Sequence, residues 1–180
     1  MTTPLRLLLI SGSTRDSSTN TAALRTVAAT VPADIEATLY DGLADLPQFV
    51  PGTDGPSTAE TLHKTIGAAD AVLICTPEYA GMIPGSLKNL LEWTVGTADL
   101  HDKPVAYVNV AYEGRGEEAV ATLRTVLGYV GADLVEAASA RITVLQNMIG
   151  ADGTVEDPAV RNRLAAAAVA LAAHVRGGNR

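Results

Sequence analysis

Short apolar segments alternate strictly with segments of helical periodicity along this chain, and no other feature restricts its fold as much. The wholly apolar residues 71–75 and the mainly apolar residues 5–10 are typical of strands buried on both faces. Strands that alternate with helices pair in parallel, because each crossover returns the chain to the same end of the sheet. The sequence therefore predicts an α/β fold with a five-stranded parallel sheet and helices on both faces.

The expected strands cover residues 5–10, 35–40, 70–75, 104–110 and 134–138. The expected helices cover residues 20–31, 57–67, 84–96, 117–130 and 157–175. No internal repeat, low-complexity segment or linker interrupts the pattern, so residues 1–180 are expected to form a single domain. A common strand order for such a doubly wound sheet is 2-1-3-4-5, and its ligand crevice then lies beyond the carboxyl ends of strands 1 and 3.

Composition argues against several other functions. The chain is 47% hydrophobic and 18% charged, the opposite of the balance found in disordered proteins. A formal net charge of −7 disfavours nucleic acid as a partner. The longest apolar run near the N-terminus, residues 7–10, is too short for a signal-peptide core or a membrane span. With one cysteine and three scattered histidines, we expect a cytoplasmic protein with no structural metal and no membrane partner.

The segment after the first strand, residues 11–20, is rich in hydroxyl groups and leads directly into a helix. A helix N-terminus favours an anion, and Arg15 adds a positive charge. The segment lacks the Gly-Lys-Ser/Thr of a Walker A loop and the later glycines of a dinucleotide-binding loop, so a single phosphate group suits it better. The candidate phosphate ligands are Ser11, Ser13, Thr14, Arg15, Ser18, Thr19 and Asn20. Alternatively these residues only cap the helix, although one of them would suffice for that.

The segment after the third strand, residues 76–89, contains two prolines and two glycines. Such a stiff loop can hold backbone N–H groups in fixed directions, as the edge of an isoalloxazine ring requires. Tyr79, Met82 and Ile83 offer apolar contacts to the face of that ring. The alternative is an ordinary strand–turn–helix connection, with Pro84 starting the helix and Met82 in the core.

At these two segments the chain resembles the NADPH-dependent FMN reductase family, which includes chromate, quinone and azo-dye reductases. The first matching stretch is Ser11-Gly12-Ser13-Thr14-Arg15, followed by Ser18 and Asn20. The second is Thr76-Pro77-Glu78-Tyr79, followed by Pro84-Gly85, Leu87-Lys88-Asn89 and Trp93. The order and spacing of both stretches fit the family, and so does the strand–helix layout up to the predicted fifth strand.

The resemblance implies a flavodoxin-like fold that holds FMN without a covalent bond. It implies that the FMN phosphate is bound by Ser11, Ser13, Arg15, Ser18 and Asn20. It implies that the isoalloxazine ring is lined by Pro77, Glu78, Tyr79 and Gly81. It also implies a homodimer, or a dimer of dimers that forms a homotetramer, packed partly through the third and fourth helices.

Some positions depart from the family pattern. Ala80 stands where many relatives carry Asn, and Glu92 stands where Asp is frequent. The loop at residues 109–116 replaces a Ser-rich and Gly-rich turn that is usual in the family. We expect this loop to reach the pyrimidine side of the flavin, so Ala111, Tyr112 and Gly114 join Ala80 as candidate ring contacts. Tyr112 and Glu113 are bulkier than the residues usual in the family and are expected to narrow the site. This should affect which electron acceptor fits more than whether the flavin binds.

The implied function is NAD(P)H-dependent reduction of FMN, followed by electron transfer to a quinone, a flavin, an azo compound or a metal oxyanion. NADH and NADPH both stay open as donors, and their phosphates have Arg15 and residues 114–116 as candidate contacts. The flavin N5 carries the chemistry, so no side chain is assigned a catalytic role. Cys75 is expected to lie in the core, and Trp93 is expected to be a packing or interface anchor rather than a flavin contact.

The main alternative is a flavodoxin-type electron carrier, which binds FMN but oxidises NAD(P)H poorly by itself. A nucleotide-phosphate hydrolase on the same fold would need a general base or metal-binding carboxylates near the first loop. Asp16 is the only acid in that loop, and its position suits a helix cap better.

Overall fold

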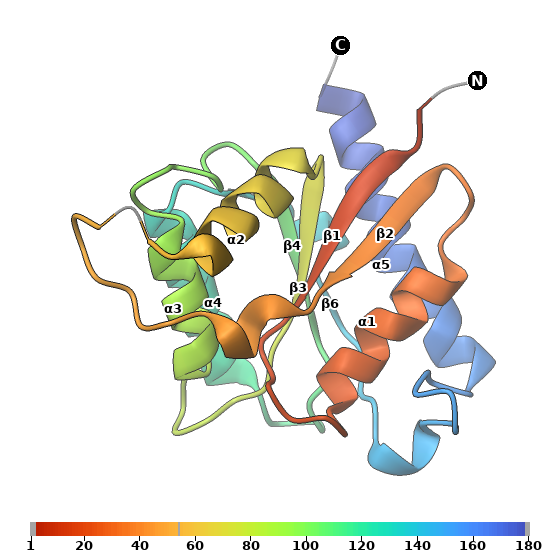
Figure 1. Ribbon diagram of the computed structural model, residues 1–180. Coiled ribbons are helices and arrows are strands. Elements are labelled where there is room, and N and C mark those ends of the chain that lie inside the picture. Colours follow the sequence, from red (N-terminus) through yellow and green to blue (C-terminus); the bar gives the residue numbers. More distant parts are fainter. Residues whose placement is uncertain (1–2, 54, 179–180) are drawn as a thin grey trace.

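The computed structural model describes residues 3–53 and 55–178, and a parallel sheet lies at its centre (Figure 1). The strands are β1 (Leu5–Ser11), β2 (Ile35–Tyr40), β3 (Ala71–Cys75), β4 (Pro104–Asn109), β5 (Asp133–Leu134) and β6 (Ala140–Arg141). Their order is β2-β1-β3-β4-β5, and β6 also pairs with β4. All the pairs between these strands are parallel. The predicted fold class and strand order are confirmed.

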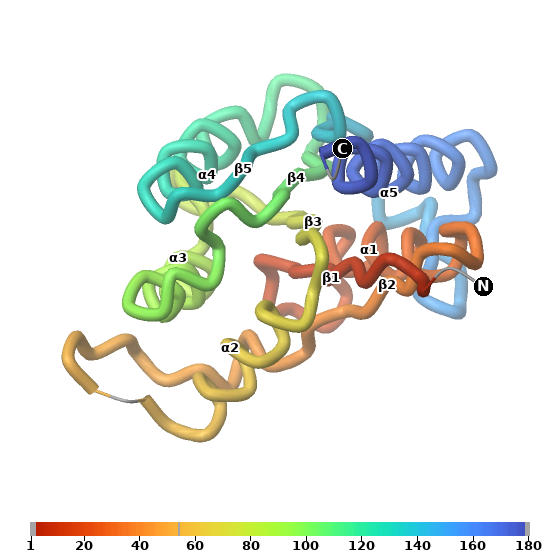
Figure 2. Tube along the Cα trace, turned by 90° about the horizontal axis from the view of Figure 1, so that it is seen from above, coloured from red at the N-terminus to blue at the C-terminus, as the bar shows by residue number. Residues whose placement is uncertain are grey.

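Helices cover both faces of this sheet, as predicted (Figure 2). One face carries α1 (Thr19–Thr30) and α5 (Pro158–Gly178), and the other carries α2 (Ser57–Ala68), α3 (Gly85–Trp93) and α4 (Glu117–Tyr129). Successive side chains of β1 point to opposite layers: Leu7 and Leu9 pack toward α1, whereas Leu8 and Ile10 pack toward α2 and α3. No helix in residues 3–53 and 55–178 is long and apolar enough to cross a bilayer.

The prediction of a continuous fifth strand over residues 134–138 is wrong. β5 ends at Leu134, a 3₁₀ turn follows over Glu136–Ala138, and β6 then resumes pairing with β4. The turn is held at its two ends, where the Val135 N–H donates to the Val105 carbonyl and the Tyr107 N–H donates to Ser139 Oγ. Edge strands tolerate such inserted residues, because only one neighbour restricts their register. The break brings Arg141 opposite Asn109 at the carboxyl end of β4.

The long loop between β2 and α2 is anchored to α3. It begins with a 3₁₀ turn at Gly42–Asp45, and its middle is held by the Asn89 side chain, which bonds to the Pro47 carbonyl and the Phe49 N–H. The Trp93 indole N–H also donates to the Pro47 carbonyl at 3.0 Å, and its ring meets Phe49 edge-on at 5.1 Å. Trp93 is 5% exposed, so it serves packing as predicted. A further 3₁₀ turn at Gln146–Met148 precedes α5.

Candidate functional site

Three loops meet at the carboxyl ends of β1, β3 and β4, where a doubly wound sheet binds its ligand (Figure 1). The first two touch directly, because the Gly12 N–H donates to the Cys75 carbonyl at 2.8 Å. A Cβ on Gly12 would overlap Thr76 Oγ1 and lie 2.7 Å from Thr76 Cβ. The absence of a side chain at residue 12 therefore lets the hydroxyl-rich loop lie against the start of the proline-containing loop.

Hydroxyl groups shape the first loop from within. Ser11 Oγ lies 2.8 Å from Thr21 Oγ1 and accepts a bond from the Ser13 N–H, while Ser13 Oγ accepts one from the Arg15 N–H. Ser18 is the N-cap of α1, and its hydroxyl accepts a bond from the Thr21 N–H at 3.4 Å. Ser18 alone therefore caps the helix, so capping does not explain the presence of the other predicted phosphate ligands.

The predicted phosphate ligands differ in how open they are. Ser11, Ser18 and Asn20 are buried, whereas Thr14 and Arg15 are exposed at the outer side of the loop. A hollow of about 240 Å³ opens beside them and is lined by Ser13, Arg15 and Tyr40, among others. Burial raises the pKa of the Tyr40 hydroxyl, and the charges of Asp41 and Asp45 raise it further, so this hydroxyl stays neutral at ordinary pH.

Asn20 and Cys75 join α1 to β3 beneath the loop. The Cys75 thiol donates to Asn20 Oδ1 at 3.3 Å, and its side chain is fully buried. Burial raises the pKa of this thiol far above the neutral range. Cys75 therefore stays protonated and belongs to the core, as predicted, rather than acting as a nucleophile.

The loop after β3 forms a tight hairpin turn. Tyr79 and Met82 exchange two backbone hydrogen bonds, of 3.0 and 3.1 Å, across Ala80 and Gly81, whose φ angles are +51° and +73°. Asn is favoured at the first central position of such a turn because it tolerates left-handed backbone, whereas Ala does so at a cost of about 1–2 kcal/mol. This explains physically why Asn is expected at position 80. The turn leaves the side chains of Tyr79 and Met82 more than half exposed, so the alternative of Met82 in the core is wrong.

Glu78 lies just before this hairpin, and its side chain reaches the N-terminus of α4. Its Oε2 accepts a bond from the Ala119 N–H at 3.1 Å. The N-cap of α4 is Gly116, which has a φ of +79° and no side chain that can cap the helix. A Cβ there would lie 2.7 Å from Asn109 Oδ1. Glu78 therefore provides from the neighbouring loop the acceptor that the helix lacks, and its negative charge suits the helix dipole.

Replacing Glu78 by Ala is expected to lower the free energy of unfolding by about 0.5–2 kcal/mol, the usual effect of losing an N-cap acceptor. Glu78→Gln should lose less, because an amide oxygen still accepts the Ala119 N–H. Urea unfolding of the apoprotein measures both effects, with Glu113→Ala as the exposed control on the next loop. Equal stability of the Ala and wild-type proteins would show that the bond contributes nothing.

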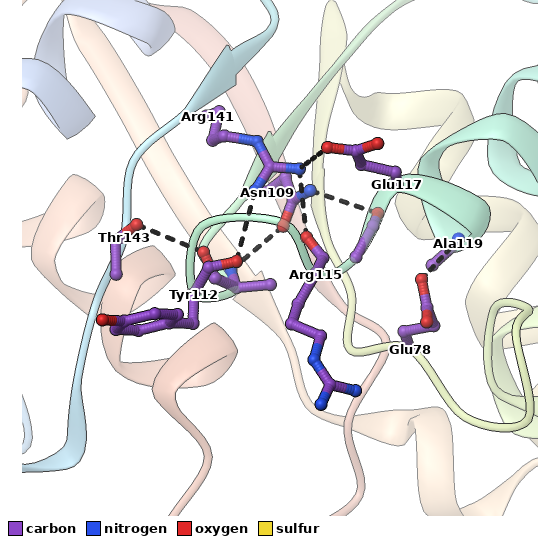
Figure 3. Close-up of polar contacts among 10 residues, drawn as sticks. Glu78, Asn109, Tyr112, Arg115, Glu117, Ala119, Arg141 and Thr143 are labelled. Atoms are coloured by element: carbon purple, nitrogen blue, oxygen red, sulfur yellow. Dashed lines mark hydrogen bonds and ion pairs between the residues drawn. The ribbon is translucent and has the colours of Figure 1, made fainter.

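The loop after β4 is tied down from three sides (Figure 3). The Asn109 side chain bonds to the Ala111 N–H and the Gly116 carbonyl. Arg141 donates to the carbonyls of Tyr112 and Arg115, at 3.3 and 3.0 Å. Thr143 donates to the Ala111 carbonyl at 3.2 Å. The predicted ring contacts Ala111, Tyr112 and Gly114 thus lie on a loop whose backbone is fixed from inside.

Sequence reasoning missed Asn109, Arg141 and Thr143 as residues that support the site. Asn109 had a usable signal, since it is a polar residue at the end of an otherwise apolar strand. Arg141 and Thr143 had none, because they follow an edge strand whose break the sequence does not reveal. Within residues 3–53 and 55–178, no group of three or more His, Cys, Asp or Glu side chains is placed to hold a metal ion.

Comparisons with known proteins agree with this geometry. The family model of NADPH-dependent FMN reductases matches residues 5–143. A protein named NAD(P)H-dependent FMN reductase from Pseudomonas aeruginosa is 31% identical over 183 aligned residues, 98% of each chain. A quinone reductase from Escherichia coli is 36% identical over 110 residues, which are 59% of this chain and 57% of that protein.

Solved structures extend the comparison to the fold. FerB, a flavoenzyme NAD(P)H:(acceptor) oxidoreductase from Paracoccus denitrificans, superposes with a TM-score of 0.80 at 26% identity. The superposition covers 94% of this chain and 98% of FerB. The match of the family model extends over all three loops of the site, and a relative matches along nearly the whole chain. The chain therefore belongs to the NADPH-dependent FMN reductase family.

Proposed function

We propose that this protein binds FMN non-covalently and passes electrons from NADH or NADPH through it to a small acceptor such as a quinone, a flavin, an azo compound or a metal oxyanion. One observation carries the proposal. A hydroxyl-rich loop at a helix N-terminus is hydrogen-bonded, through Gly12, to the strand that leads into a rigid hairpin at the same edge of the sheet. This contact supports a phosphate site and a ring site that lie side by side.

The first loop fits a terminal phosphate. Thr14 and Arg15 are exposed, and the first turn of α1 directs its N–H groups toward the loop. Ser11, Ser18 and Asn20 are buried, and their side chains already serve the loop, the cap and Cys75, whereas Ser13 is only half-buried. We therefore assign the outer phosphate contacts to Ser13, Thr14 and Arg15 and to the N–H groups of residues 18–20. Ser11, Ser18 and Asn20 chiefly shape the cradle.

The other two loops fit the isoalloxazine ring. We assign Pro77 and the hairpin residues Tyr79, Ala80 and Gly81 to the ring, and the exposed Tyr79 offers an aromatic face. Ala111, Tyr112 and Gly114 lie on the fixed loop after β4, and the Tyr112 side chain is exposed. Glu78 also belongs to the ring site, but we assign it the support of α4 rather than contact with the ring.

When bound, FMN supplies the hydride acceptor, and the chain supplies binding and orientation. Backbone N–H groups of the two ring loops would face negative charge on the reduced ring and stabilise it. We assign Arg15 and residues 114–116 as contacts for the phosphates of the nicotinamide nucleotide. This division needs no acid or base from a side chain, and the protonated Cys75 is consistent with it.

We further propose that residues 1–180 act as one cytoplasmic domain that associates as a homodimer or homotetramer. Two exposed apolar side chains support association through the third and fourth helices, since Val95, just after α3, is 60% exposed and Tyr129, the last residue of α4, is 90% exposed. A single unpaired cysteine suits a reducing compartment. A net charge of −7 supports small molecules rather than nucleic acid as partners.

The experiment is an anaerobic titration of the purified, FMN-loaded protein with NADPH and with NADH, followed by a chosen acceptor. Rapid and complete bleaching of the flavin, then recovery of its colour on addition of a quinone, is the expected result. A protein that binds FMN but bleaches only slowly would instead be an electron carrier. A protein that binds no FMN would contradict the proposal as a whole.

A further inference from the structure

Arg141, at the end of β6, makes an unusual set of contacts for a residue outside the three loops of the site. Its Nη1 donates to the Tyr112 carbonyl, and its Nη2 donates to the Arg115 carbonyl and lies 3.4 Å from Glu117 Oε1. Its side chain is 35% exposed, so the guanidinium is partly shielded from water. One side chain thereby fixes two peptide groups of the turn at residues 112–115.

Fixing a carbonyl also fixes the N–H group on the other side of the same peptide. A trans peptide is planar, so its N–H points opposite to its C=O. The Tyr112 carbonyl faces Arg141, and the N–H of Glu113 therefore points away from Arg141. The same holds for the Arg115 carbonyl and the N–H of Gly116. Figure 3 shows Arg141 on one side of the turn and the Arg115 side chain on the opposite side, together with Glu78.

We propose that Arg141 is a positioning residue for the flavin ring, because it aims the N–H groups of Glu113 and Gly116 away from β6 and toward the proposed ring site. The inference rests on the proposed function. The single positive charge of the guanidinium beside both carbonyls also polarises the two peptides, which makes each opposite N–H a stronger donor to the ring edge. Arg141 itself touches neither the flavin nor a substrate.

The broken edge strand explains why this residue is available. The turn at Glu136–Ala138 sets the register so that Arg141 pairs with Asn109. In the loop after β4, Asn109 holds the two ends, at Ala111 and Gly116, while Arg141 holds the middle. Asn109 on β4 and Arg141 on β6, which lie opposite each other, therefore hold the same loop together. Arginine suits position 141 because its planar fork reaches two carbonyls at once, which lysine cannot do.

The test compares Arg141→Met and Arg141→Lys with Arg124→Met. Arg124 is a matched control, since it lies on α4, packs over Tyr107 and bonds to Glu136 in the turn of the edge strand rather than to the loop at residues 111–116. The measurements are the dissociation constants of FMN and riboflavin, the midpoint potential of bound FMN, and thermal unfolding of the apoproteins.

Arg141→Met should weaken FMN and riboflavin equally, by about tenfold, the scale of one or two lost hydrogen bonds. It should also make the midpoint potential more negative, because fewer aligned N–H groups face the reduced ring. The affinity and potential of Arg141→Lys should lie between those of Arg141→Met and of the wild type, and Arg124→Met should leave both unchanged. The difference in potential is decisive, since a loss of stability alone does not alter it.

Two negative outcomes are distinguishable. A wild-type protein that binds neither flavin contradicts the proposed function, and the inference falls with it. A wild-type protein that binds FMN, with Arg141→Met and Arg124→Met giving the same affinity and potential as each other, contradicts only the role of Arg141. A loss of FMN affinity that spares riboflavin would also overturn it, because the effect would then lie at the phosphate.

Discussion

Replacing Gly12 by alanine is expected to lower the free energy of unfolding by about 1–3 kcal/mol, the usual cost of forcing extra atoms into a packed site. The added Cβ would overlap Thr76 Oγ1 and would lie 3.0 Å from Leu87 Cδ2. The two loops would have to separate, and the 2.8 Å bond from the Gly12 N–H to the Cys75 carbonyl would weaken. FMN binding should fall with it, because the phosphate loop would no longer lie beside the ring loop.

A second glycine provides a control of the opposite sign. Gly67 lies in α2, is exposed, and has no atom within 4 Å of the position that a Cβ would take. Gly67→Ala should therefore raise the free energy of unfolding by about 0.5–1 kcal/mol, because alanine restricts the unfolded chain and favours a helix. Urea unfolding measures both variants under identical conditions.

A double-mutant cycle locates the cause of the Gly12→Ala effect. Thr76→Gly removes the two atoms nearest to the new Cβ, so the combined variant should be more stable than the sum of the two single effects predicts. Strict additivity would mean that the clash lies elsewhere, and the close approach of the two loops would lose its explanation. A Gly12→Ala protein with unchanged stability and unchanged FMN affinity would contradict the arrangement itself.

The alternation of apolar segments with helical segments allowed the parallel sheet and the two helical layers to be predicted, and the strand order was expected as a common order of such doubly wound sheets. The alternation of Leu7 and Leu9 with Leu8 and Ile10 between two layers is a direct result of strand geometry. The edge of the sheet was less predictable. Residues 134–138 read as a strand, but the break depends on bonds to β4 from residues 135 and 139, which no local pattern reveals.

Within the candidate site, residue types were easier to predict than their roles. The hydroxyls of the first loop pointed to a phosphate, yet several of them serve the loop itself, as the bonds of Ser11 and Ser13 show. Glu78 is predicted to line the ring, and the sequence did not reveal that its carboxylate also caps a helix that begins with a glycine. Such roles depend on partners 29 to 41 residues away in sequence, as for Arg141 with Tyr112 and for Glu78 with Ala119. Folding must bring them together before they can be recognised.

Arg15→Ala is expected to weaken FMN binding by about 1.5–3 kcal/mol, or roughly 10- to 150-fold, the scale of a hydrogen bond to a charged group. Arg15 is exposed at the outer side of the hydroxyl-rich loop, and its own N–H bonds to Ser13 Oγ, so its side chain is directed from a fixed backbone position. The apoprotein should keep its stability, because no packing is lost. Fluorescence titration of the apoprotein with FMN measures the effect.

Riboflavin decides whether this effect arises at the phosphate. It carries the same ring and sugar chain as FMN but no phosphate, so wild-type protein should bind it far more weakly, and Arg15→Ala should change its affinity little. The interaction energy between the variant and the missing phosphate should then equal most of the loss seen with FMN. Equal weakening of both ligands would place Arg15 at the ring or the sugar chain. Arg141→Met is expected to weaken both ligands equally, so the two arginines together separate the phosphate end of the site from its ring end.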